Sequence, residues 1–156
     1  MRRKEKEIKD TAEIEEILSK AFVCRLGLCD NGRPYVVPLC FGYEDNALYI
    51  HCAKEGKKLD IIRENNNVCF EVDIDCQVIK AEQACRFELR YKSVIGFGRA
   101  LLIEDAELKR RGLDVIMRQF SEETFEYPQQ DLEKTMVVKV EIQSMTGKIS
   151  AGENTL

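Results

Sequence analysis

The chain has 156 residues, of which 44% are hydrophobic and 33% charged, and its formal net charge is −4. This composition is typical of a globular domain and excludes a disordered or fibrous class, while the negative charge argues against general binding to nucleic acid. The apolar runs are much shorter than the roughly 18 residues of a membrane span, and no apolar segment of a signal peptide follows the basic start. We therefore expect one cytoplasmic domain over residues 1–156 that binds neither nucleic acid nor membrane.

The cysteines support a reducing compartment. There are seven, an odd number, and no two are spaced as Cys-x-x-Cys or as paired zinc ligands. Cys24, Cys40 and Cys69 lie in apolar, strand-like runs, where a free cysteine behaves as a small hydrophobic residue. We expect neither a disulfide framework nor a metal site.

The first third of the chain predicts a helix followed by an antiparallel meander. Asp10 begins a capping-box sequence, and apolar residues follow at helical spacing over residues 11–21. Strand-like runs come next, separated by short turn sequences such as Asp30-Asn31-Gly32. The expected strands cover residues 23–29, 34–43 and 47–52.

The remainder of the chain adds strands and helices without a βαβ rhythm. We expect helices over residues 57–65 and 105–120, and strands over residues 68–75, 91–103 and 136–143. Residues 76–90 show no clean period and are expected to form a long excursion near a site or a partner. About six strands and three helices predict a mainly β (α+β) fold, a closed or nearly closed antiparallel β-barrel with flanking helices.

One segment has the character of a phosphate site. The sequence contains no Gly-x-Ser-x-Gly, no P-loop and only one histidine, His51, which stands at the end of an expected strand. Gly56, Lys57 and Lys58 then open a helix, and a helix N-terminus presents unpaired N–H groups that suit an anion. The alternative is a solvated lysine pair, although lysines at this end of a helix oppose its macrodipole unless an anion lies between them.

Five motifs in order carry a resemblance to a known family. The motifs are Cys24–Leu28, Gly32–Leu39, Tyr49–Ala53, Gly56–Asp60 and Tyr91–Gly98. Over about residues 11–149 the chain resembles the pyridoxamine 5′-phosphate oxidase-like superfamily, and within it the nitroimidazole-resistance branch. The resemblance implies a split β-barrel that carries FMN at a homodimer interface and acts as an oxidoreductase on a small molecule.

The resemblance also implies which residues bind the cofactor. The implied FMN-binding positions are Val36, Val37, Pro38, Leu39, Ile50, His51, Lys57, Lys58, Ser93 and Lys148. Residues 36–39 would line the isoalloxazine through their backbone, while Ile50 and His51 would flank the ring and ribityl chain. The two lysines match the pair that holds the phosphate. Ser93 would reach the flavin from the partner subunit.

Two positions depart from the oxidase pattern or are explained in more than one way. The oxidase relatives usually have glutamine where this chain has Ser93, and their substrate-phosphate arginines have no counterpart here. Oxidation of pyridoxamine phosphate is therefore not expected. Lys148 belongs to a C-terminal motif of the nitroimidazole-resistance branch, although a loop after the last strand would explain Gly147 equally well.

His51 is the candidate catalytic residue. It matches the histidine of the His-x-Ala motif in the nitroimidazole-resistance branch, where an imidazole can donate a proton as a nitro group is reduced. The alternative is a strand histidine that bonds a backbone carbonyl. Neighbouring side chains on a strand alternate, so Cys52 is expected on the other face of the strand.

Other functions of the same scaffold remain open. A flavin-binding protein without a dedicated substrate would serve as an electron carrier or redox sensor. A split barrel can also bind haem, with His51 as an axial ligand, or the deazaflavin F420. The sequence names neither the electron donor nor the natural acceptor.

Overall fold

Antiparallel strands dominate the architecture of the computed structural model, which describes residues 3–150. The helices are η1 (Lys4–Lys6), α1 (Thr11–Lys20), α2 (Lys57–Glu64), η2 (Ala84–Arg86), α3 (Ala106–Arg118) and α4 (Gln129–Lys134). The strands are β1 (Glu7–Ile8), β2 (Cys24–Asp30), β3 (Arg33–Leu39), β4 (Gly42–Glu44), β5 (Ala47–Ala53), β6 (Asn67–Ile79), β7 (Glu88–Ile103) and β8 (Thr135–Ser150). Among these residues, no helix is long and apolar enough to cross a membrane.

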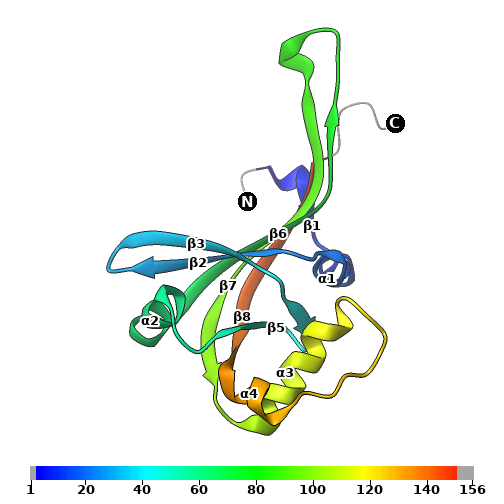
Figure 1. Cartoon of the computed structure of the whole chain (residues 1–156). Helices are drawn as coiled ribbons and strands as arrows, with labels where there is room; N and C mark the ends of the chain where they lie inside the picture. The colour runs from blue at the N-terminus through cyan, green and yellow to red at the C-terminus, as the bar shows by residue number, and fades with distance from the viewer. Residues whose placement is uncertain (1–2, 151–156) are drawn as a thin grey trace.

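The strands form one curved sheet in the order β3-β2-β6-β7-β8-β5-β4, and β1 pairs with β8. Every pairing is antiparallel. The sheet bends around a core while its end strands, β3 on one side and β4 with β5 on the other, do not pair with each other (Figure 1). The expected split antiparallel barrel with flanking helices is confirmed.

Two apolar clusters fill the two sides of β5. Leu48 and Ile50 are fully buried in the main core, which the curved sheet encloses. Tyr49 faces the other way and joins a smaller cluster with Val115 and Val137 beneath α3. The alternation of a strand therefore places successive residues of β5 in different layers.

The predicted N-caps of α1 and α3 are confirmed. A carboxylate oxygen of Asp10 accepts a hydrogen bond from the N–H of Ala12 at 2.9 Å. Asp105 accepts from the N–H groups of Glu107 and Leu108, at 3.0 and 2.9 Å. In both helices the capping side chain satisfies amides that have no partner within the helix.

Two strand boundaries differ from the prediction. The strand expected over residues 34–43 is broken at residues 40–41, because Phe41 turns into the core and is fully buried. The last strand runs to Ser150 instead of ending near residue 143. Gly147 therefore lies within β8 and not in a loop, and a Cβ there would approach side-chain atoms of Ile8 and Ile14 to 2.9 Å.

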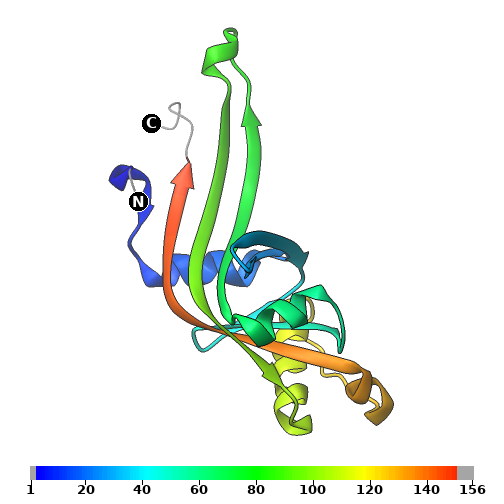
Figure 2. The same cartoon turned by 90° about the vertical axis from the view of Figure 1, so that its left-hand side faces the viewer.

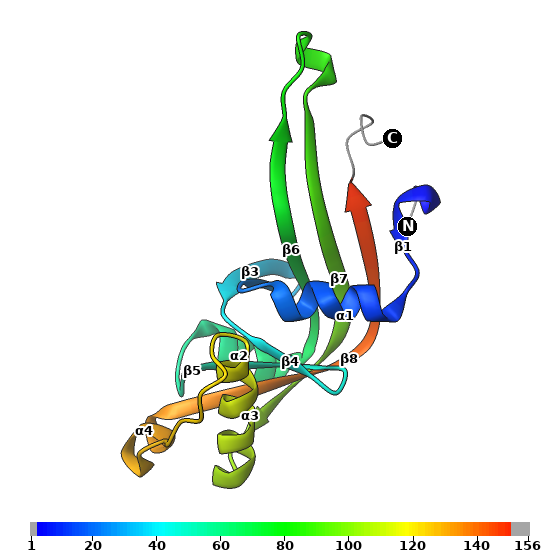
Figure 3. The same ribbon diagram turned by 90° about the vertical axis from the view of Figure 1, so that its right-hand side faces the viewer.

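Residues 76–90, expected as an irregular excursion, form most of a β-hairpin. We call residues 75–90 the hairpin arm; it comprises the end of β6, η2 and the start of β7. A bulge between Ile74 and Gln77, where Asp75 has a φ of 57°, shifts the alternation by one residue. That shift explains why the sequence shows no period here. The arm extends away from the barrel and its helices (Figures 2 and 3).

The close contact of α3 with β4 gives a stability prediction. A Cβ added to Gly42 would lie 2.3 Å from the carbonyl oxygen of Val115, so Gly42→Ala must displace the helix backbone. We expect a loss of about 2–3 kcal/mol in the free energy of unfolding, measured by urea denaturation. The control is Gly27→Ala, where the nearest atom would be 3.4 Å away. Equal losses in both variants would contradict the prediction.

Candidate functional site

A groove lies between β3, at one end of the sheet, and the end of β5, next to the start of α2. Its volume is about 370 Å³. It is lined by Tyr35, Val37, Pro38, Leu39, Cys52, Ala53, Glu55, Gly56, Lys57 and Lys58. The tertiary structure thus brings three predicted segments together: the edge strand, the end of the histidine strand and the lysine pair.

The N-terminus of α2 has the features of an anion site. Gly56 has a φ of 133°, which favours glycine, and its carbonyl accepts hydrogen bonds from Leu59 and Asp60 at 2.9 and 3.3 Å. The N–H groups of Lys57 and Lys58 have no partner among residues 3–150, and no side chain caps the helix. Unlike α1 and α3, α2 therefore presents free amides to the groove.

The two lysines have different surroundings. The Lys57 ammonium nitrogen lies 3.2 Å from a carboxylate oxygen of Asp30 and 5.0 Å from the centroid of the Tyr35 ring. Asp30 thereby supplies part of the negative charge that the helix start requires. Lys58 is half-buried and makes no ion pair with any residue the structure describes. It is the cation that remains available to a ligand.

Strand β3 presents its edge to the groove. Among residues 3–150 it pairs only with β2, so the backbone groups on its other side are available to a ligand. Val37, Pro38 and Leu39 line the groove as expected. Val36 is not among the lining residues; its side chain is 60% exposed and lies on the opposite face of the sheet.

Strand β5 separates its candidate residues between two faces. The Ile50 side chain is fully buried in the main core and is not part of the groove lining. Cys52 packs against the same core and lines the groove. His51 is exposed on the other face, opposite Val137 of β8, as the expected alternation requires. The imidazole is next to the groove in sequence but outside its lining.

Ser93 and Lys148 are neighbours in a separate part of the sheet. They are directly paired across β7 and β8, and Ser93 is buried. The Lys148 ammonium group hydrogen-bonds the Tyr91 hydroxyl and lies 4.9 Å from the centroid of that ring. Val137 of β8 pairs with His51 on one side and with Ile103 of β7 on the other. Ile103 is ten residues along β7 from Ser93. At about 3.3 Å per residue this is roughly 33 Å of strand, so Ser93 and His51 lie far apart along the sheet of one copy. Neither Ser93 nor Lys148 lines the groove.

A single sheet face connects these two parts. We call it the outer face, and define it by the row Val36, Gly27, Cys69 and Phe97 and by the alternate residues of β7. The exposed apolar side chains on its barrel portion are Val36, Ile95, Phe97 and Leu101. His51, Ser93 and Lys148 belong to the same face by their register.

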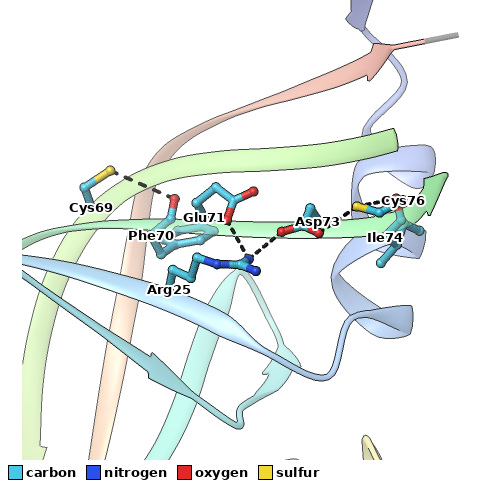
Figure 4. Close-up of polar contacts among 7 residues, drawn as sticks. All are labelled: Arg25, Cys69, Phe70, Glu71, Asp73, Ile74 and Cys76. Carbon is cyan, nitrogen blue, oxygen red and sulfur yellow. Dashed lines mark hydrogen bonds and ion pairs between the residues drawn. The ribbon is translucent and has the colours of Figure 1, made fainter. Parts of the chain in front are cut away.

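A charged cluster crosses the outer face beside Ser93. Arg25 forms an ion pair with Glu71 at 3.0 Å and a second with Asp73, which also accepts a hydrogen bond from the Cys76 thiol at 2.9 Å (Figure 4). Partial burial raises the pKa of Glu71, and the hydrogen bond to Asp73 raises the pKa of Cys76. The described residues contain no His, Cys, Asp and Glu grouping suited to a metal ion.

Several groove residues were not predicted from the sequence. Asp30 and Tyr35 contact Lys57 only because the β2–β3 hairpin folds over the start of α2. No local sequence pattern predicts a contact between residues so far apart in the chain. Gly56, in contrast, is part of the segment that the sequence predicts, since it stands directly before the helix that the two lysines begin.

Comparisons with known proteins extend this description. The family model of pyridoxamine 5′-phosphate oxidase matches residues 10–149. A proposed 5-nitroimidazole antibiotic resistance protein from Bacteroides thetaiotaomicron is 38% identical, with a TM-score of 0.83, over 92% of this chain and 86% of that one. A search of the curated proteins finds no match.

Two more distant structures share the fold. Flavocytochrome Anf3 from Azotobacter vinelandii is 24% identical, with a TM-score of 0.83, over 97% of this chain and 72% of its own. The FAD and heme binding protein from Mycobacterium smegmatis is 22% identical, with a TM-score of 0.84, over 94% of this chain and 74% of its own. At these identities the likeness concerns the fold alone.

Proposed function

Because the chain belongs to the pyridoxamine 5′-phosphate oxidase family, we propose that it is an oxidoreductase that binds FMN in the groove between β3 and β5 and reduces a small molecule, of the nitroimidazole type. The observation that carries this proposal is the open N-terminus of α2. Its free amides and the unpaired Lys58 meet the requirements of a phosphate dianion.

The rest of the groove suits the remainder of the cofactor. Val37, Pro38 and Leu39 would hold the isoalloxazine along the edge of β3, and Tyr35 lines the groove beside Lys57, near the expected phosphate end. When bound, FMN supplies two-electron redox chemistry. The chain supplies binding, orientation and a proton donor.

A second copy of the chain would complete the site. The groove is open, and neither Ser93 nor Lys148 lines it within one copy. A two-fold dimer through the outer face would bring the Ser93 and Lys148 of one copy toward the groove of the other. We therefore propose a homodimer with two equivalent sites, each shared between the subunits.

His51 is the proposed proton donor. It is exposed on the outer face, the face that the second copy would cover, where an imidazole would meet an acceptor placed between the subunits. The likeness to the Bacteroides thetaiotaomicron protein supports a nitro compound as that acceptor. The competing function, a flavin carrier without a substrate, is favoured by the position of His51 outside the groove lining.

The purified protein tests this proposal directly. We expect the absorption bands of oxidised flavin, release of FMN on denaturation as identified by mass spectrometry, and a dimer by light scattering. Riboflavin, which lacks the phosphate, should bind much more weakly than FMN. A colourless protein that takes up neither compound would refute the proposal, and haem bands or released deazaflavin would identify a different cofactor.

A substitution of Asp30 is expected to strengthen FMN binding. Because its carboxylate competes with a phosphate for Lys57, Asp30→Asn should strengthen FMN binding by about 3- to 10-fold, the range of a partly exposed ion pair. Fluorescence titration measures the change, and riboflavin binding should stay the same. The control is Asp60→Asn, which removes an ion pair with Arg63 from the same helix. Weaker FMN binding by Asp30→Asn would contradict the placement of the phosphate.

A further inference from the structure

The hairpin arm has one apolar and one polar face. Val78 and Leu89 are paired across its two strands, and with Phe87 they expose 59%, 49% and 49% of their surface. Gln77 and Arg90, the next pair along the ladder, point to the other face. A two-stranded ribbon is marginally stable in water, and the arm stands clear of the helices (Figures 2 and 3). We therefore expect its apolar face to be buried against another surface.

The apolar face of the arm continues into the outer face of the barrel. Alternate residues of β7 share one face, and the bulge at Asp75 brings Val78 onto that face as well. The side chains in this line are Leu89, Tyr91, Ser93, Ile95, Phe97, Arg99 and Leu101. Phe87 directly precedes the strand, at the end of η2. A partner molecule that packs on Ile95 and Phe97 can therefore also pack on the apolar face of the arm.

The exposed apolar area of the outer face is too small for a stable interface without the arm. A standard interface buries about 800 Å² on each partner, of which roughly 500 Å² is apolar. A large apolar side chain has on the order of 150–200 Å² of surface, so the four half-exposed ones on the barrel supply roughly 350 Å². The three on the arm raise this to about 600 Å². The barrel portion alone falls short of a stable interface, whereas barrel and arm together reach it.

We propose that the apolar face of the hairpin arm packs on a second copy of this chain, and that this contact couples FMN affinity to dimerisation. The inference rests on the proposed function, because it assumes that Ser93 and Lys148 of the second copy complete the FMN site in the groove. These two residues lie just below the base of the arm, next to Tyr91. An arm held against the second copy fixes them over its groove, and by two-fold symmetry the other arm does the same.

A paired substitution on the apolar face tests the proposal. Val78→Thr combined with Leu89→Thr keeps residues suited to strands but removes apolar contact. We expect the dimer dissociation constant, measured by analytical ultracentrifugation, to rise by about 10- to 100-fold. FMN titrations should then depend on protein concentration: weak binding below the new dissociation constant and near-original binding above it. The original protein should show no such dependence.

The control is Gln77→Thr, on the polar face of the same strand, which should leave both constants unchanged. Phe87→Gln, which lies between η2 and β7 and outside the ladder, provides a second variant if the first unfolds the arm. Circular dichroism and thermal melting confirm that each variant is folded.

The outcomes separate this proposal from the function on which it rests. If the variants bind FMN and dimerise as tightly as the original, the arm proposal is wrong and the FMN site stands. If the original is a monomer at micromolar concentration, the arm proposal and the shared site are both wrong. If neither protein binds FMN but the arm variants dissociate, the arm forms the interface and the proposed cofactor is wrong.

Discussion

Replacing both Lys57 and Lys58 by alanine is expected to weaken FMN binding by about 10²- to 10⁴-fold. Each charge-assisted hydrogen bond contributes about 1.5–3 kcal/mol, which corresponds to roughly 10- to 150-fold in the dissociation constant for each single change. The loss should be unequal between the single variants, because Lys57 already shares its charge with Asp30 whereas Lys58 has no ion pair among the described residues. Lys58→Ala should therefore be the more damaging. Quenching of flavin fluorescence measures each constant.

Riboflavin separates a phosphate contact from a general effect on the groove. It should bind the original protein poorly and be almost unaffected by either lysine substitution. Lys54→Ala, which removes an exposed lysine outside the groove lining, should leave FMN binding unchanged. Equal weakening of FMN and riboflavin would mean that the lysines support the groove without touching the phosphate, and unchanged FMN binding would make them a solvated helix start.

Replacing His51 by alanine is expected to lower turnover by about 10²-fold or more while FMN remains bound, because a positioned general acid contributes roughly this factor. His51 is exposed, and its backbone pairing with β8 does not depend on the side chain. The flavin content and the melting temperature should therefore change little. The measurement follows reoxidation of the pre-reduced flavin by a 5-nitroimidazole in a stopped-flow instrument, so that no electron donor has to be known.

A neighbouring cation completes this test. Lys139→Met removes a cation from the neighbouring row of the same face and should leave the reoxidation rate of the flavin unchanged. Full turnover in a flavin-loaded His51→Ala protein would instead favour the electron carrier, or a different donor of the proton.

The order and type of most elements are determined locally, and the sequence predicted them well. Helix α1 begins where Asp10 caps it, and α2 begins after a glycine that permits a positive φ. Both depend on contacts within a few residues, as does the alternation of apolar side chains in β6 and β8. The lysine pair at the start of α2 is contiguous in the chain. Its position on a helix N-terminus therefore required no knowledge of the fold.

The tertiary structure alone decided how the candidate residues are grouped. Hydrophobic periodicity gives the face of a strand but not the strand it pairs with, since pairing depends on how the whole sheet closes. Only the curvature of the sheet brings Asp30 to Lys57 and places Val37 and Cys52 in the lining of the same groove. The bulge at Asp75 adds one residue and reverses the alternation of side chains. Because of this reversal, the sequence pattern did not predict the strands of the hairpin arm.

The same limit applies to the residues at the two ends of β7. The family resemblance implied that Ser93, Lys148 and His51 belong to flavin sites, with Ser93 reaching the flavin from the partner subunit. Within one copy, the register separates Ser93 and Lys148 from His51 by roughly 33 Å of strand. Strand register is set by many weak cross-strand contacts that no short motif encodes. The sequence therefore determined which residues have the chemistry expected of a flavin site, and the strand register decided which of them lie together within one copy.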